Sequence, residues 1–121
     1  MLTRRLWLGL GWLQTLGLVV LCLLPLTALP GHEIPWSDKI YHCASFALLM
    51  WWFTVAQPRT QWRRTGLLLI LLGTAIEFAQ GFVPLRSPSL ADALADVGGV
   101  LLGAFVAHLT PTRLPAWRPT A

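Results

Sequence analysis

The stretch LADALADVGGVLLGAFVAHL, residues 90–109, decides the fold class of this chain. Its length suits a membrane-spanning helix, which needs about 20 mainly apolar residues. Its acids and glycines recur at spacings of four, three and four residues, which puts them on one helix face: Asp92, Asp96, Gly99 and Gly103. Gly99 and Gly103 form a G-x-x-x-G pair, which lets two helices approach closely. We therefore expect a helix that turns this face toward other helices.

Three further apolar runs make the same prediction for the rest of the chain. Together with residues 90–109, the candidate spans are residues 6–24, 40–56 and 66–83. The 121 residues are 55% hydrophobic and only 12% charged, with a mean hydropathy of +0.62, which is too apolar for an ordinary soluble domain. The sequence predicts an all-α bundle of four transmembrane helices, a single domain over residues 1–121 with a tail at 110–121.

Basic residues predict the orientation of these spans, because short cytoplasmic loops carry an excess of Lys and Arg. Most of them flank the ends expected on the inside: Arg4, Arg5, Arg59, Arg63, Arg64, Arg113 and Arg118. Lys39 and Arg86 remain for the outer side. We expect both termini and the tail in the cytoplasm, and a multi-pass membrane protein. Because the basic residues flank apolar runs and form no patch, the pI near 10.1 predicts no nucleic-acid partner.

The N-terminus has one alternative interpretation, a cleaved signal peptide. Arg4 and Arg5 precede an apolar run, and small residues follow near Ala28, as in a signal sequence. The apolar run exceeds the usual signal length of about 7–15 residues, which favours a retained helix.

Most of the ionisable and amide residues within the spans fall at similar depths. With a rise of about 1.5 Å per residue, the outer half of the membrane receives five of them: His42, Glu77, Gln80, Asp92 and Asp96. Ionisable residues inside a membrane are costly and usually mark function. We predict that these residues, with Arg86, lie close together in the outer half of the bundle.

Several of these residues and their neighbours also have a purely structural interpretation. Ser89 and Asp92 have the S-x-x-D spacing of a capping box, and Asp38 could likewise cap a helix. Lys39 and Arg86 could be interfacial anchors, and an isolated His42 would more often be a hydrogen-bonded interior residue. Glu77 has no cap role within the apolar run, so it should pair with a cation or bind a proton.

No spaced motif indicates a metal or cofactor. His42, Glu77, Asp92 and Asp96 offer ligand atoms, but their spacing matches neither HExxH nor a Cys/His site. The sequence therefore predicts no bound metal and no cofactor.

Two segments, SDKIYHCASF at residues 37–46 and EFAQGFVPLR at residues 77–86, resemble the VanZ-like family of small bacterial membrane proteins. The continuation through Ser89, Asp92, Gly99 and Gly103 fits the same family pattern. One departure is Asp96, where the family usually has Asn. The resemblance implies a four-helix, multi-pass protein of the bacterial cytoplasmic (inner) membrane. Through founding members, it also implies an association with resistance to the glycopeptide teicoplanin. It implies no agreed chemical activity, so whether the chain is an enzyme stays open.

Three functions are compatible with these observations. The first is a cell-envelope accessory factor that affects surface lipids or wall precursors and so changes tolerance to glycopeptide-type antibiotics. The second is an outer-leaflet enzyme acting on a lipid-linked phosphate or a lipid head group. The third is a proton-coupled carrier, which the one-sided position of the polar residues disfavours. For all three functions we expect membrane lipids as partners. For the first two we also expect lipid-linked envelope precursors.

The polar residues divide into two sets of candidates for such a site. The candidate catalytic residues are His42, Glu77, Asp92 and Asp96. The candidate substrate-binding residues are Asp38, Lys39, Gln80, Arg86 and Ser89. Arg86 and Lys39 would bind a phosphate, and His42 or Glu77 would serve as acid or base.

Overall fold

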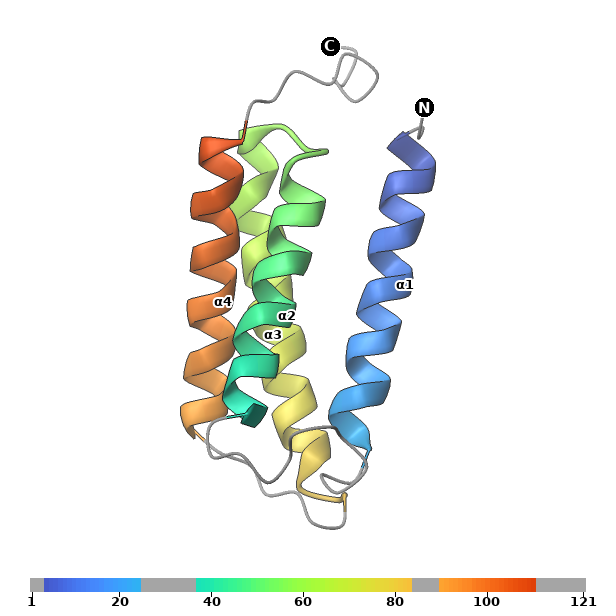
Figure 1. Ribbon diagram of the computed structural model, residues 1–121, viewed down its shortest axis with the longest axis vertical. Helices are drawn as coiled ribbons and strands as arrows, with labels where there is room; N and C mark the ends of the chain where they lie inside the picture. The colour runs from blue at the N-terminus through green and yellow to red at the C-terminus, as the bar shows by residue number, and fades with distance from the viewer. Residues whose placement is uncertain (1–3, 25–36, 84–89, 111–121) are drawn as a thin grey trace.

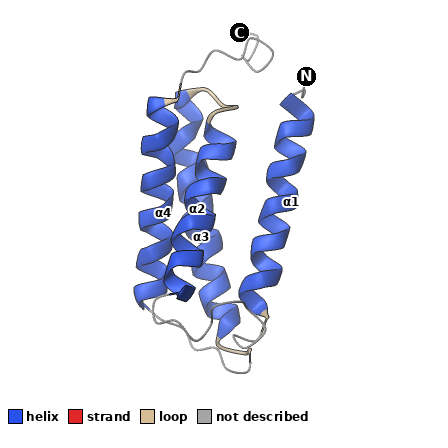
Figure 2. Cartoon of the chain, in the orientation of Figure 1, coloured by secondary structure: helices blue, strands red, loops and turns tan. Residues whose placement is uncertain are grey.

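Four α-helices make up the computed structural model of the chain (Figure 1). The structure describes residues 4–24, 37–83 and 90–110, apart from the side chains of residues 37 and 38. The elements are α1 (Arg4–Leu23), α2 (Ser37–Thr54), the short 3₁₀ helix η2 (Arg59–Gln61), α3 (Trp62–Gln80) and α4 (Leu90–Leu109). Figure 2 shows helices and loops and no strand in the described part. The prediction of an all-α fold with four helices is confirmed.

The helix ends differ by a few residues from the apolar runs. Helix α4 has the bounds of its apolar run, whereas α2 begins at Ser37 and α3 at Trp62, three and four residues before theirs. Polar residues at a helix start lower the hydropathy of the segment, but their backbones can still form the hydrogen bonds of the helix. Helices α2 and α3 therefore begin before their apolar runs. Helix α2 ends at Thr54, four residues before Pro58, and a turn joins it to η2.

Helices α2 and α4 form the closest pair in the bundle, and two glycines make this possible. A Cβ added to Gly99 would meet the backbone oxygen of Cys43, and one added to Gly103 would meet that of Ala47. Any larger side chain at either position would push the two backbones apart. The expected close approach at the G-x-x-x-G pair is confirmed, and its partner is α2.

Helix α1 packs against α2 and α3 and stands beside the other three helices in Figure 1. Its close approach to α2 is at Gly11, where an added Cβ would lie 2.8 Å from the Phe53 ring. One turn earlier, the Trp7 and Trp52 rings stack with centroids 3.7 Å apart. Each of these two rings also donates its Nε1 hydrogen to the other residue's backbone oxygen, at 2.7 Å.

The surface of the described bundle is apolar on the outside of every helix. Exposed large side chains include Leu13 of α1, Ile40 of α2, Leu71 of α3 and Phe105 of α4. By length and hydropathy, two of the described helices, α1 and α4, could cross a membrane. Helices α2 and α3 contain more polar residues, and several of these are buried inside the bundle.

Candidate functional site

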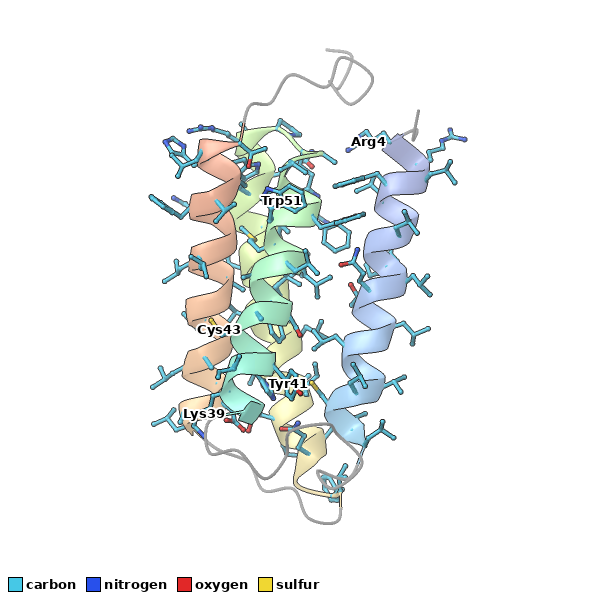
Figure 3. The ribbon with its side chains drawn as sticks, viewed as in Figure 1. Arg4, Lys39, Tyr41, Cys43 and Trp51 are labelled. Carbon is cyan, nitrogen blue, oxygen red and sulfur yellow. The ribbon has the colours of Figure 1, made fainter. Side chains whose placement is uncertain are left out.

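Four ionisable side chains gather inside one end of the bundle, and we call His42, Glu77, Asp92 and Asp96 the polar cluster. Each is at most 7% exposed. Figure 3 shows which end this is, because Lys39 and Tyr41 lie at the bottom of the view while Arg4 and Trp51 lie at the top. The cluster therefore lies at the end where α2 and α4 begin, away from the start of α1.

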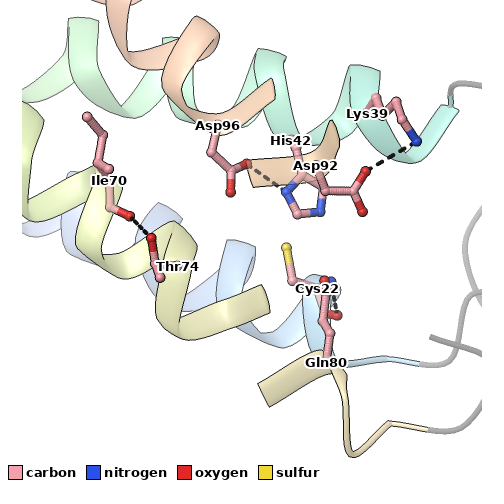
Figure 4. A network of polar contacts seen from close by, with 8 residues as sticks. All are labelled: Cys22, Lys39, His42, Ile70, Thr74, Gln80, Asp92 and Asp96. Carbon is pink, nitrogen blue, oxygen red and sulfur yellow. Dashed lines mark hydrogen bonds and ion pairs between the residues drawn. The ribbon is translucent and has the colours of Figure 1, made fainter. Parts of the chain in front are cut away.

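The shortest contact in the cluster joins α2 to α4. Nδ1 of His42 lies 2.7 Å from Oδ1 of Asp96, and both side chains are almost fully buried. With Asp96 ionised, the carboxylate accepts and Nδ1 donates, which places the ring's lone pair on Nε2. Figure 4 shows the opposite edge of the ring turned toward Asp92. The close α2–α4 packing at Gly99 lies three residues along α4 from Asp96.

A second contact between α2 and α4 lies nearer the end of the bundle. Nζ of Lys39 is 3.4 Å from Oδ1 of Asp92, an ion pair drawn as a dashed line in Figure 4. The Lys39 side chain is 35% exposed and that of Asp92 only 6%. Lys39 thus connects the buried carboxylate with the outside of the bundle, a position that the anchor interpretation alone did not predict.

Glu77 brings α3 into the same cluster. A ligand-type atom from each of His42, Glu77 and Asp92 lies within 4.8 Å of the other two. Three different helices therefore contribute to one small buried volume. This convergence agrees with the prediction that these residues lie at a similar depth. Their catalytic roles stay a prediction.

Gln80 makes a contact beside the polar cluster for which the sequence analysis predicted no partner. Its Nε2 donates to the backbone oxygen of Cys22 at 2.8 Å, which joins the end of α3 to the end of α1. Figure 4 shows this contact beside the cluster. Each residue of an α-helix advances about 100°, so the three steps from Glu77 to Gln80 leave the two side chains about 60° apart around the helix axis. This difference is enough for Gln80 to face another neighbour. The contact gives Gln80 a structural role, and its assignment to substrate binding stays a prediction.

Three predicted site residues lie outside this description. Arg86 and Ser89 belong to residues 84–89, which are not described, and of Asp38 only the backbone is. Their assignment to substrate binding stays a prediction.

The sequence analysis did not include Gly73, which borders the cluster. A Cβ added to Gly73 would lie 2.6 Å from Oδ2 of Asp96. Asp96 is thus held between the His42 ring and the α3 backbone. Gly73 is four residues before Glu77 and so shares its helix face, a spacing that could have drawn attention to it.

The arrangement suits proton transfer or the binding of a cation. A histidine oriented by a carboxylate can act as a general acid or base, and two further carboxylates can accept protons or hold a positive charge. Lys39 adds a cation that could bind an anionic group at the exposed edge.

Comparison with known proteins gives one match. A search of curated proteins found none, and a search of solved structures also found none. The family model described as VanZ/LLP1 matches residues 10–111, which include all four helices except the first turns of α1. The two segments that carry the resemblance and the glycines of α4 lie within this range. The chain therefore belongs to the VanZ/LLP1 family.

Proposed function

We propose that the chain is a four-span protein of the bacterial inner membrane, with both ends cytoplasmic. The supporting observation is an inside-out distribution of polarity. Large apolar side chains are exposed on all four helices, whereas His42, Glu77, Asp92 and Asp96 are buried between them. This distribution suits lipid as the surrounding medium, since an ionisable residue in a membrane faces the bundle interior. It supports the proposal that α2 and α3 also cross the membrane.

Accessibility of introduced cysteines tests this topology. In a background with Cys22 and Cys43 replaced by Ala, Thr60→Cys would report on η2 and Gly81→Cys on the exposed turn after α3. A membrane-impermeant maleimide should label Gly81→Cys in intact spheroplasts and Thr60→Cys only after lysis. Labelling of Thr60→Cys before lysis, with Gly81→Cys protected, would reverse the orientation.

We further propose that the protein is a cell-envelope factor that acts on surface lipids or lipid-linked wall precursors at the outer leaflet. The single observation that carries this function is the polar cluster at the end of the bundle opposite the start of α1. In the proposed topology that end faces outward. The family resemblance adds the expected consequence, a change in tolerance to glycopeptide-type antibiotics.

A deletion strain complemented with matched histidine variants tests this function. His42→Gln alters the cluster, whereas His108→Gln makes the same change at an exposed position at the other end of α4. Envelope lipids, wall precursors and teicoplanin susceptibility should differ between deletion and wild type, after permeabilisation of any outer membrane. His108→Gln should restore the wild-type state and His42→Gln should not. Restoration by both variants, or no difference on deletion, would contradict the proposal.

A second candidate, an enzyme acting on a lipid-linked phosphate, is favoured by the contact between His42 and Asp96. A ring nitrogen 2.7 Å from a buried carboxylate oxygen is the arrangement that orients a general acid or base. Purified protein in mixed micelles should then release phosphate from a polyprenyl diphosphate, and Arg86→Ala should lower this release if Arg86 binds the phosphate. Wild-type release by Arg86→Ala would reject that role for Arg86. No release by the wild type would reject this reaction.

A further inference from the structure

Three side chains with metal-ligand chemistry converge from three helices. His42 of α2, Glu77 of α3 and Asp92 of α4 each place one ligand atom within 4.8 Å of the others. Ligands about 2.0–2.2 Å from one tetrahedral zinc ion lie about 3.3–3.6 Å from each other. The observed upper limit of 4.8 Å exceeds this spacing by about 1 Å, so the three side chains would have to move slightly inward around a bound ion.

The histidine of this group is already oriented as metal-bound histidines are. Its Nδ1 lies 2.7 Å from Oδ1 of Asp96, a residue that is not one of the three. A metal-ligating histidine almost always donates its other ring N–H to a carboxylate, a backbone oxygen or water, which fixes the tautomer and makes the ligating nitrogen more basic. Gly73 in turn limits where the Asp96 carboxylate can move. Asp96 and Gly73 thus form a support behind the His42 ring.

The charges in this volume also favour a cation. With the ring neutral, Glu77 and Asp92 contribute two carboxylates at short separation, and Asp96 adds a third. Like charges this close repel strongly where the dielectric constant is low. Lys39, at 3.4 Å from Asp92 and partly exposed, offsets one of them at the edge.

We propose that His42, Glu77 and Asp92 bind one divalent transition-metal ion, with Zn²⁺ as the ion whose preferences fit best. An imidazole ligand favours Zn²⁺ over Mg²⁺ and Ca²⁺, which prefer oxygen alone. Three protein ligands leave a fourth position for water or a phosphate oxygen, as in catalytic zinc sites. Asp96 is a positioning residue that acts through His42. The sequence analysis predicted no metal because no motif with metal-ligand spacing is present. Such motifs lie within one segment of the chain, so they do not reveal a site whose ligands come from three helices.

Metal titration of the purified full chain in detergent tests this site without a substrate. After removal of metals, the protein should bind one Co²⁺ per chain with visible absorption bands, and Zn²⁺ should displace it. His42→Gln, Glu77→Gln and Asp92→Asn should each weaken Zn²⁺ binding at least about tenfold. His108→Gln, an exposed histidine at the opposite end of α4, is the matched control and should bind like the wild type.

Two variants of Asp96 test the positioning role. Asp96→Ala removes the acceptor of the Nδ1 hydrogen and should weaken binding about 10–100-fold, with altered Co²⁺ bands. Asp96→Asn keeps an amide oxygen that accepts the same hydrogen and should recover most of the affinity. Equal loss in both variants would reject the positioning role.

Several outcomes would overturn the site itself. The first is that the wild type binds neither Co²⁺ nor Zn²⁺ at a 100-fold excess of the ion. The second is that His42→Gln keeps the helical content and elution volume of the wild type and binds the metal as tightly. If a variant does not fold, pulsed electron paramagnetic resonance of the Mn²⁺-loaded wild type decides, since a missing histidine nitrogen signal contradicts the assignment. Metal binding without any envelope phenotype would contradict only the proposed function. An envelope phenotype that depends on His42 without metal binding would contradict only this inference.

Discussion

Tryptophans hold one end of the bundle together, and ionisable groups fill the other. At the first, Trp7 and Trp52 stack and exchange two hydrogen bonds with backbone oxygens, and Trp62 donates to the Thr54 and Gln57 carbonyls. At the second, the contacts join carboxylates to His42 and Lys39. A neutral indole ring that donates one hydrogen can stabilise a helix end, but it offers neither a group for proton transfer nor an anionic ligand for a metal ion. The difference teaches that one end is suited to anchoring and the other to chemistry.

The largest expected effect comes from the packing that positions the chemical end. Gly99→Ala would place a Cβ against the Cys43 backbone oxygen, so α2 and α4 must separate. We expect a loss of about 1–3 kcal/mol in the free energy of unfolding, or no folded protein at all. Gly98→Ala, with open space around its Cβ, is the neighbouring control and should be neutral or slightly stabilising. Thermal unfolding in detergent measures both, and equal melting temperatures would contradict the close α2–α4 contact.

The next effect should be on function with the fold retained. Glu77→Gln keeps the shape of a buried side chain but removes its charge, so we expect loss of complementation in the deletion strain at wild-type abundance. Thr74→Val on the same helix changes only a local bond to the Ile70 carbonyl and serves as the control. Full complementation by Glu77→Gln would remove the functional distinction between the two ends.

A smaller effect is expected at the glycine behind Asp96. Gly73→Ala would place a Cβ 2.6 Å from Oδ2 of Asp96 and displace the carboxylate from His42, which should lower complementation severalfold. Because the displaced Asp96 oxygen is the end of a side chain, the free energy of unfolding should fall by only about 1 kcal/mol. Gly66→Ala on the same helix meets Met50 and Val100 at an ordinary 3.4 Å and should behave as the wild type. If the two variants complement equally, the Asp96 position is not critical.

The smallest effect on function should come from the anchoring end. Trp52→Phe removes the donor to the Trp7 carbonyl and reduces the stacked area, so we expect a loss of about 0.5–1.5 kcal/mol in the free energy of unfolding. Complementation should be unchanged at equal protein levels. A functional defect as severe as that of Glu77→Gln would show that the two ends do not divide these roles.

Much of this division could be predicted from the sequence. Four apolar runs predicted the four helices, and the spacing of Gly99 and Gly103 predicted a close helix contact. The similar depth of His42, Glu77 and Asp92 followed from the helix rise and the expected alternation of direction.

Partners across helices could not be predicted in the same way. That His42 pairs with Asp96 while Lys39 pairs with Asp92 depends on how α2 is rotated and shifted against α4. Gln80 shows the same limit, because its bond to Cys22 depends on where α1 packs. Periodicity within a helix gives the face of a residue but not the neighbour that this face meets.

The glycine contact between α2 and α4 has a consequence for how far the sequence can vary. The distance between the His42 ring and the Asp96 carboxylate is set by two backbones that touch, not by side chains on the outside of the bundle. Exposed positions of α4, such as Leu101 and Phe105, can therefore exchange among apolar residues without moving either group. Substitutions should accumulate freely on the outer surface of this helix while Gly99 and Gly103 stay fixed.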